Sequence, residues 1–296
     1  INKMEKVKDI KRGMSAAYQV AHEMLRDRLE DVDENMVSEF DSLSDTDVVV
    51  SRGKYDFIEQ VFNGIGLKYT MVDPLDFDSM SLHPDQIVFI NCPGELGRKG
   101  IRQLVTFVEK GGFLFTTDWA LRHVLERAFP SYVKHNGEVT SDEVVRVEFV
   151  SSDDPFLKTL MGSEDDPQWW LEGSSYPIKI LDRKKVDILI KSKELGGKYG
   201  ESAIFVTFDH GEGKVYHMIS HFYLQRSETR TKRHAFSGEE YLKEKLEMND
   251  MRSMKYEKMG IRKSNLAEVE SAYASSSMMQ KVLWDKKKKS PNKDER

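Results

Sequence analysis

The hydrophobic pattern is clearest in residues 86–119, where two continuous apolar runs flank a segment with helical spacing. The first run, residues 87–90, is typical of a strand that is covered on both faces. In residues 97–110, the apolar positions are three, one and three apart and share one face of a helix. A Gly-Gly pair ends this helix, and a second apolar run begins at residue 113. The segment therefore predicts a βαβ unit with parallel strands and a right-handed crossover.

Comparable runs on both sides extend the pattern into a larger sheet. Upstream, strands are expected at residues 47–51 and 67–73, with a helix between them. Downstream, strands are expected at residues 144–150, 178–181, 186–190, 203–208 and 214–221. The aromatic-rich residues 169–177 are expected to form a loop. This order of strands and helices predicts an α/β fold with a doubly wound, mostly parallel sheet.

The two ends of the chain differ in character from this centre. Residues 4–29 have helical periodicity, and we expect a helix that covers the sheet or binds a partner. Residues 30–47 carry eight acidic and no basic residues, the composition of a solvated linker. Beyond residue 225 the chain is charged, with a helix start expected at Ser237-Gly-Glu-Glu240, another helix at 264–284 and a disordered basic tail from Lys286. We therefore predict three parts: 1–45, 46–225 and 226–296.

Ligands of such sheets bind beyond the carboxyl ends of the strands, and several polar or turn residues fall there. One loop, Asn91-Cys92-Pro93-Gly94, combines a proline with a glycine that can take positive φ. The ligand-binding candidates at the strand ends are Arg52, Gly53, Asn91, Pro93, Gly94 and Trp119.

The strand, Pro-Gly loop, Gly-Gly-terminated helix and second strand resemble the middle of the class I glutamine amidotransferase-like fold. The resemblance covers residues 46–225 and is closer to non-amidotransferase relatives: trehalose-utilisation-type proteins, domains beside gliding-motility transporters and an intraflagellar-transport N-terminal domain. It implies a three-layer, flavodoxin-like sandwich. In amidotransferases the strand after the Gly-Gly helix ends in a nucleophilic cysteine, but here it ends in Thr116-Thr117-Asp118-Trp119. The single cysteine, Cys92, lies one strand earlier, so the resemblance does not carry the amidotransferase reaction to this chain.

Four residues are candidates for catalysis. Cys92 is a nucleophile if His221 lies beside it, and an inert buried thiol otherwise. Asp118 either caps the following helix or forms a carboxylate pair with Glu95, for acid–base chemistry or a divalent ion. A carbohydrate-acting enzyme would combine such carboxylates with stacking tryptophans, which Trp119 and the 169–170 pair supply.

Other chemistries lack their sequence signatures. No zinc-binding Cys/His spacing, P-loop or GxGxxG motif is present, so we predict no metal and no cofactor. The net charge of −5 makes nucleic acid an unexpected partner. No apolar run approaches the roughly 20 residues that cross a bilayer, and a single cysteine fits a reducing compartment. We expect a cytoplasmic protein.

Two functional hypotheses follow. The sequence favours a catalytically degenerate module that binds a small ligand at the strand ends, or a protein partner or second copy through the terminal helices. The alternative is a hydrolase or isomerase that acts on a carbohydrate or amide through Asp118 and Glu95, with His221 or Cys92. Convergence of Asp118, Glu95 and His221 in one open pocket would favour the enzyme. A crevice filled by Trp119 or a loop would favour the binding module.

Overall fold

The predicted βαβ unit forms the middle of the sheet in the computed structural model, which describes residues 3–150, 154, 156–157, 166–222, 230–239 and 250–289. Strand β3 (Ile87–Ile90) and strand β4 (Phe113–Thr117) pair in parallel, and helix α4 (Arg98–Glu109) connects them. Every residue of both strands is buried, as their continuous apolar runs predict.

Six further strands complete an eight-stranded sheet in the order β2-β1-β3-β4-β12-β11-β10-β7. They are β1 (Val48–Ser51), β2 (Thr70–Val72), β7 (Glu148–Phe149), β10 (Val186–Lys191), β11 (Ala203–His210) and β12 (Gly213–Met218). Strands β2, β1, β3, β4 and β12 are mutually parallel, and β11, β10 and β7 continue the sheet through antiparallel pairs. The predicted α/β fold with a mostly parallel central sheet is confirmed.

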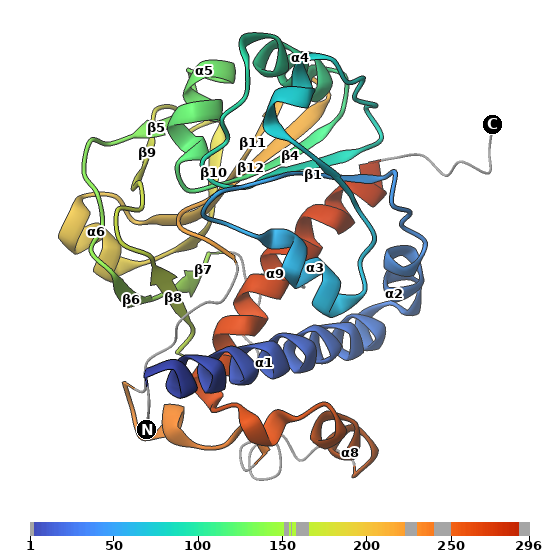
Figure 1. Cartoon of the computed structure of the whole chain (residues 1–296), viewed down its shortest axis with the longest axis vertical. Coiled ribbons are helices and arrows are strands. Elements are labelled where there is room, and N and C mark those ends of the chain that lie inside the picture. The colour runs from blue at the N-terminus through green and yellow to red at the C-terminus, as the bar shows by residue number, and fades with distance from the viewer. Residues whose placement is uncertain are drawn as a thin grey trace.

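Helices cover both faces of the sheet (Figure 1). Helix α4 lies on one face with a π-helical turn, η2 (Leu121–Leu125), and the short helix α5 (Glu126–Ala128). Helices α3 (Ile58–Ile65) and α9 (Leu266–Lys289) lie on the other. The long helix α1 (Lys3–Val32) packs outside that layer, against α9 and α3.

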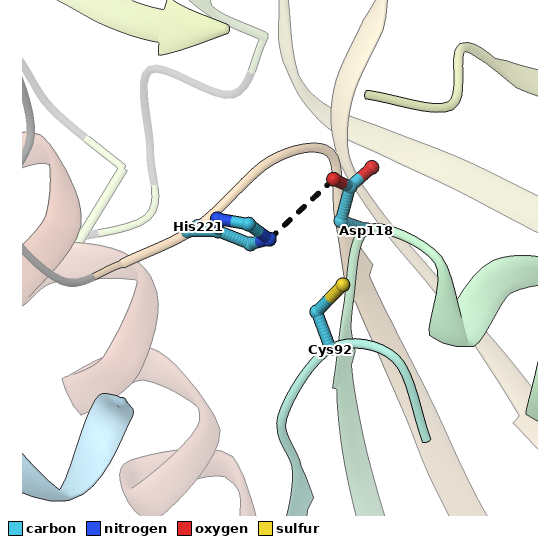
Figure 2. Close-up of side chains that lie close together, drawn as sticks. All are labelled: Cys92, Asp118 and His221. Atoms are coloured by element: carbon cyan, nitrogen blue, oxygen red, sulfur yellow. Dashed lines mark ion pairs between the residues drawn. The ribbon is translucent and has the colours of Figure 1, made fainter. Parts of the chain in front are cut away.

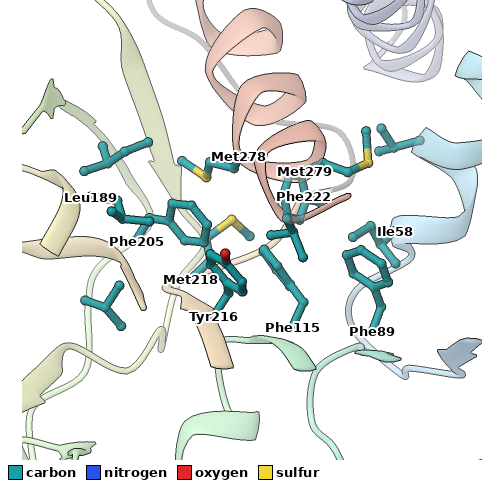
Figure 3. Packing of buried hydrophobic residues seen from close by; sticks show 14 of the residues in the cluster. Ile58, Phe89, Phe115, Leu189, Phe205, Tyr216, Met218, Phe222, Met278 and Met279 are labelled. Atoms are coloured by element: carbon teal, nitrogen blue, oxygen red, sulfur yellow. The ribbon is translucent and has the colours of Figure 1, made fainter. Parts of the chain in front are cut away.

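Helix α9 contributes directly to the core (Figure 3). Its Met278 and Met279 extend toward a group of aromatic residues on and beside the sheet that includes Phe205 and Phe222. Most of the 24 residues of α9 are buried, and one hydrophobic cluster contains residues of α1, the sheet and α9. Both terminal helices are therefore continuous with the core of the α/β unit.

The remaining elements are small. Two two-stranded sheets pair β5 (Val133–His135) with β9 (Ile178–Ile180) and β6 (Glu143–Arg146) with β8 (Gln168–Leu171). The other helical elements are α2 (Glu34–Asp41), α6 (Lys193–Tyr199), α8 (Asp250–Lys258) and the 3-10 turns η1 (Pro74–Asp78), η3 (Arg233–Ala235) and η4 (Ile261–Lys263). Within the described ranges, no helix has both the length and the apolar character that crossing a bilayer requires.

Three local predictions are wrong. Residues 34–41 form helix α2 instead of a solvated linker, because Asp33 accepts a hydrogen bond from the Asn35 backbone amide at the helix start and Met36 is buried. The predicted 169–177 loop begins with strand β8, since pairing with β6 satisfies its backbone.

The third correction concerns the end of α9, which continues through Lys289. The ammonium group of Lys286 is buried and donates to the carbonyl oxygens of Pro84 and Gly111, the latter at 2.8 Å. It also lies 5.0 Å from the centre of the Phe113 ring. These contacts hold the last helical turn against the sheet. The rest of the predicted basic tail, residues 290–296, lies outside the described residues, as do 223–229 and 240–249 of the C-terminal region.

Candidate functional site

The carboxyl ends of β3, β4 and β12, which are neighbours in the sheet, bring together Cys92, Asp118 and His221. One potential ligand atom from each side chain lies within 4.8 Å of the other two. Figure 2 shows the Cys92 thiol and the His221 ring directed toward the Asp118 carboxylate. The His221 Nε2 atom is 3.5 Å from Asp118 Oδ2. All three residues are at least 95% buried.

Asp118 is fixed by backbone and side-chain contacts at the turn after β4. Its φ of 43° lies in the left-handed region, which aspartate tolerates better than most residues. Its carboxylate accepts a hydrogen bond from the Tyr176 amide at 2.8 Å and another from the Ser175 hydroxyl at 3.2 Å. The side chain therefore faces the 172–177 loop and does not cap the following helical turn, where no side-chain cap is formed. The helix-capping interpretation is not supported.

His221 is oriented by a second carboxylate. Its Nδ1 atom hydrogen-bonds to Glu172, which directs the opposite nitrogen, Nε2, toward Asp118. Glu172 also contacts the residue before His221, because its backbone amide donates to the Ser220 hydroxyl at 2.9 Å. Ser220 itself has a φ of 63°. Two residues with positive φ, Asp118 and Ser220, thus lie in the turns that present the group, and such conformations cluster at functional sites.

Cys92 is held at the start of a closely packed loop. Its amide donates to the Thr117 hydroxyl at 3.0 Å, and its carbonyl accepts from the Lys54 amide at 3.0 Å. Gly53 passes so close that a β-carbon there would lie 2.5 Å from the Asn91 β-carbon and 2.8 Å from the Cys92 carbonyl oxygen. Glycine at position 53 is therefore a packing requirement of the Cys92 loop.

Burial controls the protonation of the three groups. It raises the pKa of the Cys92 thiol to about 11, although a hydrogen bond with His221 opposes the rise. It also raises the pKa of Asp118 to about 6, against the charge of His221 and two hydrogen bonds to the carboxylate. For His221, burial acts to lower the pKa, but hydrogen bonds with Cys92 and Glu172 and nearby carboxylates outweigh it and raise the pKa to about 11. At neutral pH the group holds an unreactive thiol, a carboxylate and an imidazolium.

Two predicted polar candidates at the strand ends do not join this group. Glu95 forms an ion pair with Lys54 at the surface and has no contact with Asp118 in the described part of the chain, so the expected carboxylate pair is absent there. Arg52 pairs with Asp73 at 2.8 Å, and both side chains are about 60% exposed.

The other candidates in the 91–94 loop have local roles. The Asn91 side chain is buried, accepts from the Ile58 amide and donates to Glu59, so it anchors the start of α3. Pro93 follows Cys92 through a cis peptide bond, and Gly94 has a φ of 76° that favours glycine. These residues shape the loop that carries Cys92.

Aromatic side chains lie beside Asp118. The indole nitrogen of Trp119 donates to the Ser174 carbonyl at 2.7 Å. Its ring stacks on Tyr176 with centroids 5.5 Å apart, and it meets the edge of the half-exposed Tyr55 at 5.3 Å. Trp169, in contrast, is fully buried, with its nitrogen bonded to the Ile219 carbonyl. Only Trp119 of these two is available beside the site.

Glu172, Ser175 and Tyr176 are the site residues that sequence reasoning missed. They belong to the segment expected to be a loop, and they directly follow β8, which pairs with β6. The one available signal was an isolated acid followed by small residues in an aromatic-rich stretch. That pattern is too common to indicate a site.

No protein-family model and no characterised protein matches the sequence. Among solved structures, the exo-beta-1,4-mannosidase Op5Man5 from Opitutaceae bacterium strain TAV5 shares 12% identity with a TM-score of 0.38, covering 58% of this chain and 30% of the mannosidase. The cytoplasmic protein STM3548 of Salmonella typhimurium shares 12% identity with a TM-score of 0.41, covering 60% and 88%. A ThuA-like protein from Bacteroides uniformis shares 10% identity with a TM-score of 0.40, covering 60% and 82%. At this level of identity and TM-score, no function and no functional residue can be transferred from these three proteins to this chain.

Proposed function

We propose that the chain is an enzyme of the amidotransferase-like α/β type, with a hydrolytic or isomerising site centred on Asp118 and His221. The observation that carries the proposal is the convergence of Cys92, Asp118 and His221 at three adjacent strand ends. Burying three ionisable groups opposes folding unless they are compensated, and such groups gather at functional sites. The strained turn at Asp118 supports the same assignment.

The roles follow from the contacts. Asp118 and His221 are the groups that would exchange protons with the substrate, and Glu172 positions the His221 ring. Cys92 lies beside His221, as a nucleophile would, but burial raises the pKa of its thiol, so we assign the reacting groups as Asp118 and His221. The Glu172 side chain is 43% exposed, which makes its side of the group the solvent-facing one.

A carbohydrate is the preferred substrate class, with an amide as the alternative. The half-exposed Tyr55 packs against Trp119, the residue after Asp118, and sugar rings stack on exposed aromatic side chains of this kind. Amide hydrolysis would use the same reacting centre without that surface.

The decisive experiment compares turnover by the full chain and its Asp118→Asn variant on nitrophenyl glycosides and aryl amides. We expect wild-type hydrolysis of at least one substrate and a loss of about 100-fold or more in the variant, the usual effect of removing a catalytic acid or base. Glu95→Gln is the matched control, because Glu95 lies at the surface away from Asp118 and its loss should leave turnover unchanged. Equal turnover by Asp118→Asn and wild type would reject the proposal.

The second candidate is the ligand-binding module. It is favoured by the low exposure of the group: 1% for Cys92, 3% for Asp118 and 5% for His221. A folded wild type without turnover, whose melting temperature rises with one sugar or nucleotide, would favour this candidate over the enzyme.

A further inference from the structure

We propose that Cys92, Asp118 and His221 together bind one divalent metal ion, and that this ion is zinc. The proposal deepens the enzymatic function proposed above, since it names what the reacting centre would hold. Three independent features support it: the spacing of the donor atoms, the contacts that orient them, and the kind of atoms they present.

The spacing is close to that of a tetrahedral site. Zinc bonds of about 2.0–2.3 Å at tetrahedral angles place ligand atoms roughly 3.3–3.8 Å apart. The Nε2 atom of His221 and the Oδ2 atom of Asp118 are already 3.5 Å apart. All three potential ligand atoms fall within 4.8 Å of one another, so closing the set around an ion requires a movement of roughly 1 Å.

The contacts around the group are those that hold metal ligands in place. A metal-binding histidine usually gives its second ring nitrogen to a carboxylate, and His221 Nδ1 is bonded to Glu172. Metal-binding carboxylates are themselves hydrogen-bonded, and Asp118 accepts from the Tyr176 amide and the Ser175 hydroxyl. Glu172 and Ser175 thus orient the donors from outside the set.

The donor types select the ion. One sulfur, one nitrogen and one oxygen atom suit zinc, which accepts all three, and do not suit magnesium or calcium, which prefer oxygen alone. Zinc binds a cysteine as the thiolate and a histidine as the neutral ring, so binding at these residues should release protons. Three protein ligands leave a fourth position for water or substrate, which is the arrangement of catalytic zinc sites.

The test is zinc binding by the full chain after treatment with a chelator. Zinc is titrated in competition with a chromophoric chelator, and metal content is measured after dialysis. We expect one zinc ion per wild-type chain, and loss of this ion in Cys92→Ser and His221→Asn. Cobalt added to the wild type should give the charge-transfer band of a thiolate ligand, and Cys92→Ser should lack that band. His83→Gln, which changes an exposed histidine, should bind as the wild type does.

Glu172→Gln tests the site even if the ligand variants fail to fold, because the Glu172 side chain is partly exposed and is not itself a proposed ligand. We expect it to stay folded, with a cooperative melting transition without zinc, and to bind zinc about 10–100 times more weakly. The proposal is overturned if the wild type binds no zinc, or if Cys92→Ser and His221→Asn bind it as tightly as wild type. A wild type that turns over substrate but binds no zinc would reject the metal alone, whereas bound zinc without turnover would reject the enzymatic function alone.

Discussion

His217 shows how a buried residue can make the stability of the protein depend on pH. It lies in β12 with no exposed surface, and its Nδ1 atom is 2.8 Å from the Thr116 hydroxyl. Its other nitrogen has no hydrogen-bond partner among the described residues. Burial lowers the pKa of His217 from 6.5 to about 3, and a hydrogen bond with Thr116 only partly opposes this. The folded protein therefore requires the neutral ring.

The sign of the pH dependence follows directly. Below pH 6.5 the unfolded chain takes up a proton at His217 that the folded chain refuses until about pH 3, so stability is lost as the pH falls through this window. Between pH 7 and 5 this one residue should lower the free energy of unfolding by about 2 kcal/mol.

Urea denaturation at a series of pH values checks this prediction. His217→Gln cannot titrate and should lose about 2 kcal/mol less than the wild type between pH 7 and 5, whatever its stability at pH 7. The exposed His83→Gln is the control and should follow the wild-type profile. Parallel profiles for wild type and His217→Gln would show that His217 does not carry the effect.

At the scale of elements, the loop after β1 depends on close contact with the loop after β3. A β-carbon at Gly53 would lie 2.5 Å from both the Asn91 β-carbon and the Asp56 carbonyl oxygen. Gly53 is partly buried, and its β-carbon would overpack these contacts, so Gly53→Ala should cost about 1–3 kcal/mol of unfolding free energy. The new β-carbon would also displace Cys92, because it would lie 2.8 Å from the Cys92 carbonyl oxygen.

Gly64→Ala is the matched control, because Gly64 lies in α3 and no atom would come within 4 Å of its new β-carbon. It should be neutral or stabilise the protein by up to about 1 kcal/mol, since alanine favours a helix over glycine. Thermal or urea unfolding of the two variants measures the contrast. Equal changes in unfolding free energy for the two variants would mean that the loops after β1 and β3 accommodate a β-carbon at position 53 without strain.

At the scale of the molecule, α9 completes the layer that covers one face of the sheet. The helix is buried on most sides, and its Met278 and Met279 pack toward Phe205 and Phe222 (Figure 3). A chain of residues 46–225 alone would expose this apolar surface. We expect it to aggregate or to lack a cooperative unfolding transition.

A chain that ends at Lys289 is the control for this prediction. It keeps α9 and the buried Lys286 contacts, so it should unfold cooperatively at the wild-type temperature. Circular dichroism during heating distinguishes the two chains. Cooperative unfolding of residues 46–225 alone would show that the terminal helices are separate extensions.

Local pattern was enough for much of the fold. The continuous apolar runs of β3 and β4 predict buried parallel strands, because strands covered on both faces have this composition. Pattern failed where stability comes from distant partners. Helix α9 has weak amphipathic character because it is buried nearly all round, and Lys286 is held by carbonyl groups from residues 84 and 111. The acidic segment that forms α2 was misjudged from charge alone.

The sequence by itself determined the strand ends on which Cys92, Asp118 and His221 lie, since the order of strands and helices is encoded by local hydrophobic periodicity. Only the tertiary structure decided that these three meet while Glu95 turns away toward Lys54. The ligand spacing of a metal site cannot appear along the chain when each donor comes from a different strand. It arises only when parallel pairing sets those strand ends side by side.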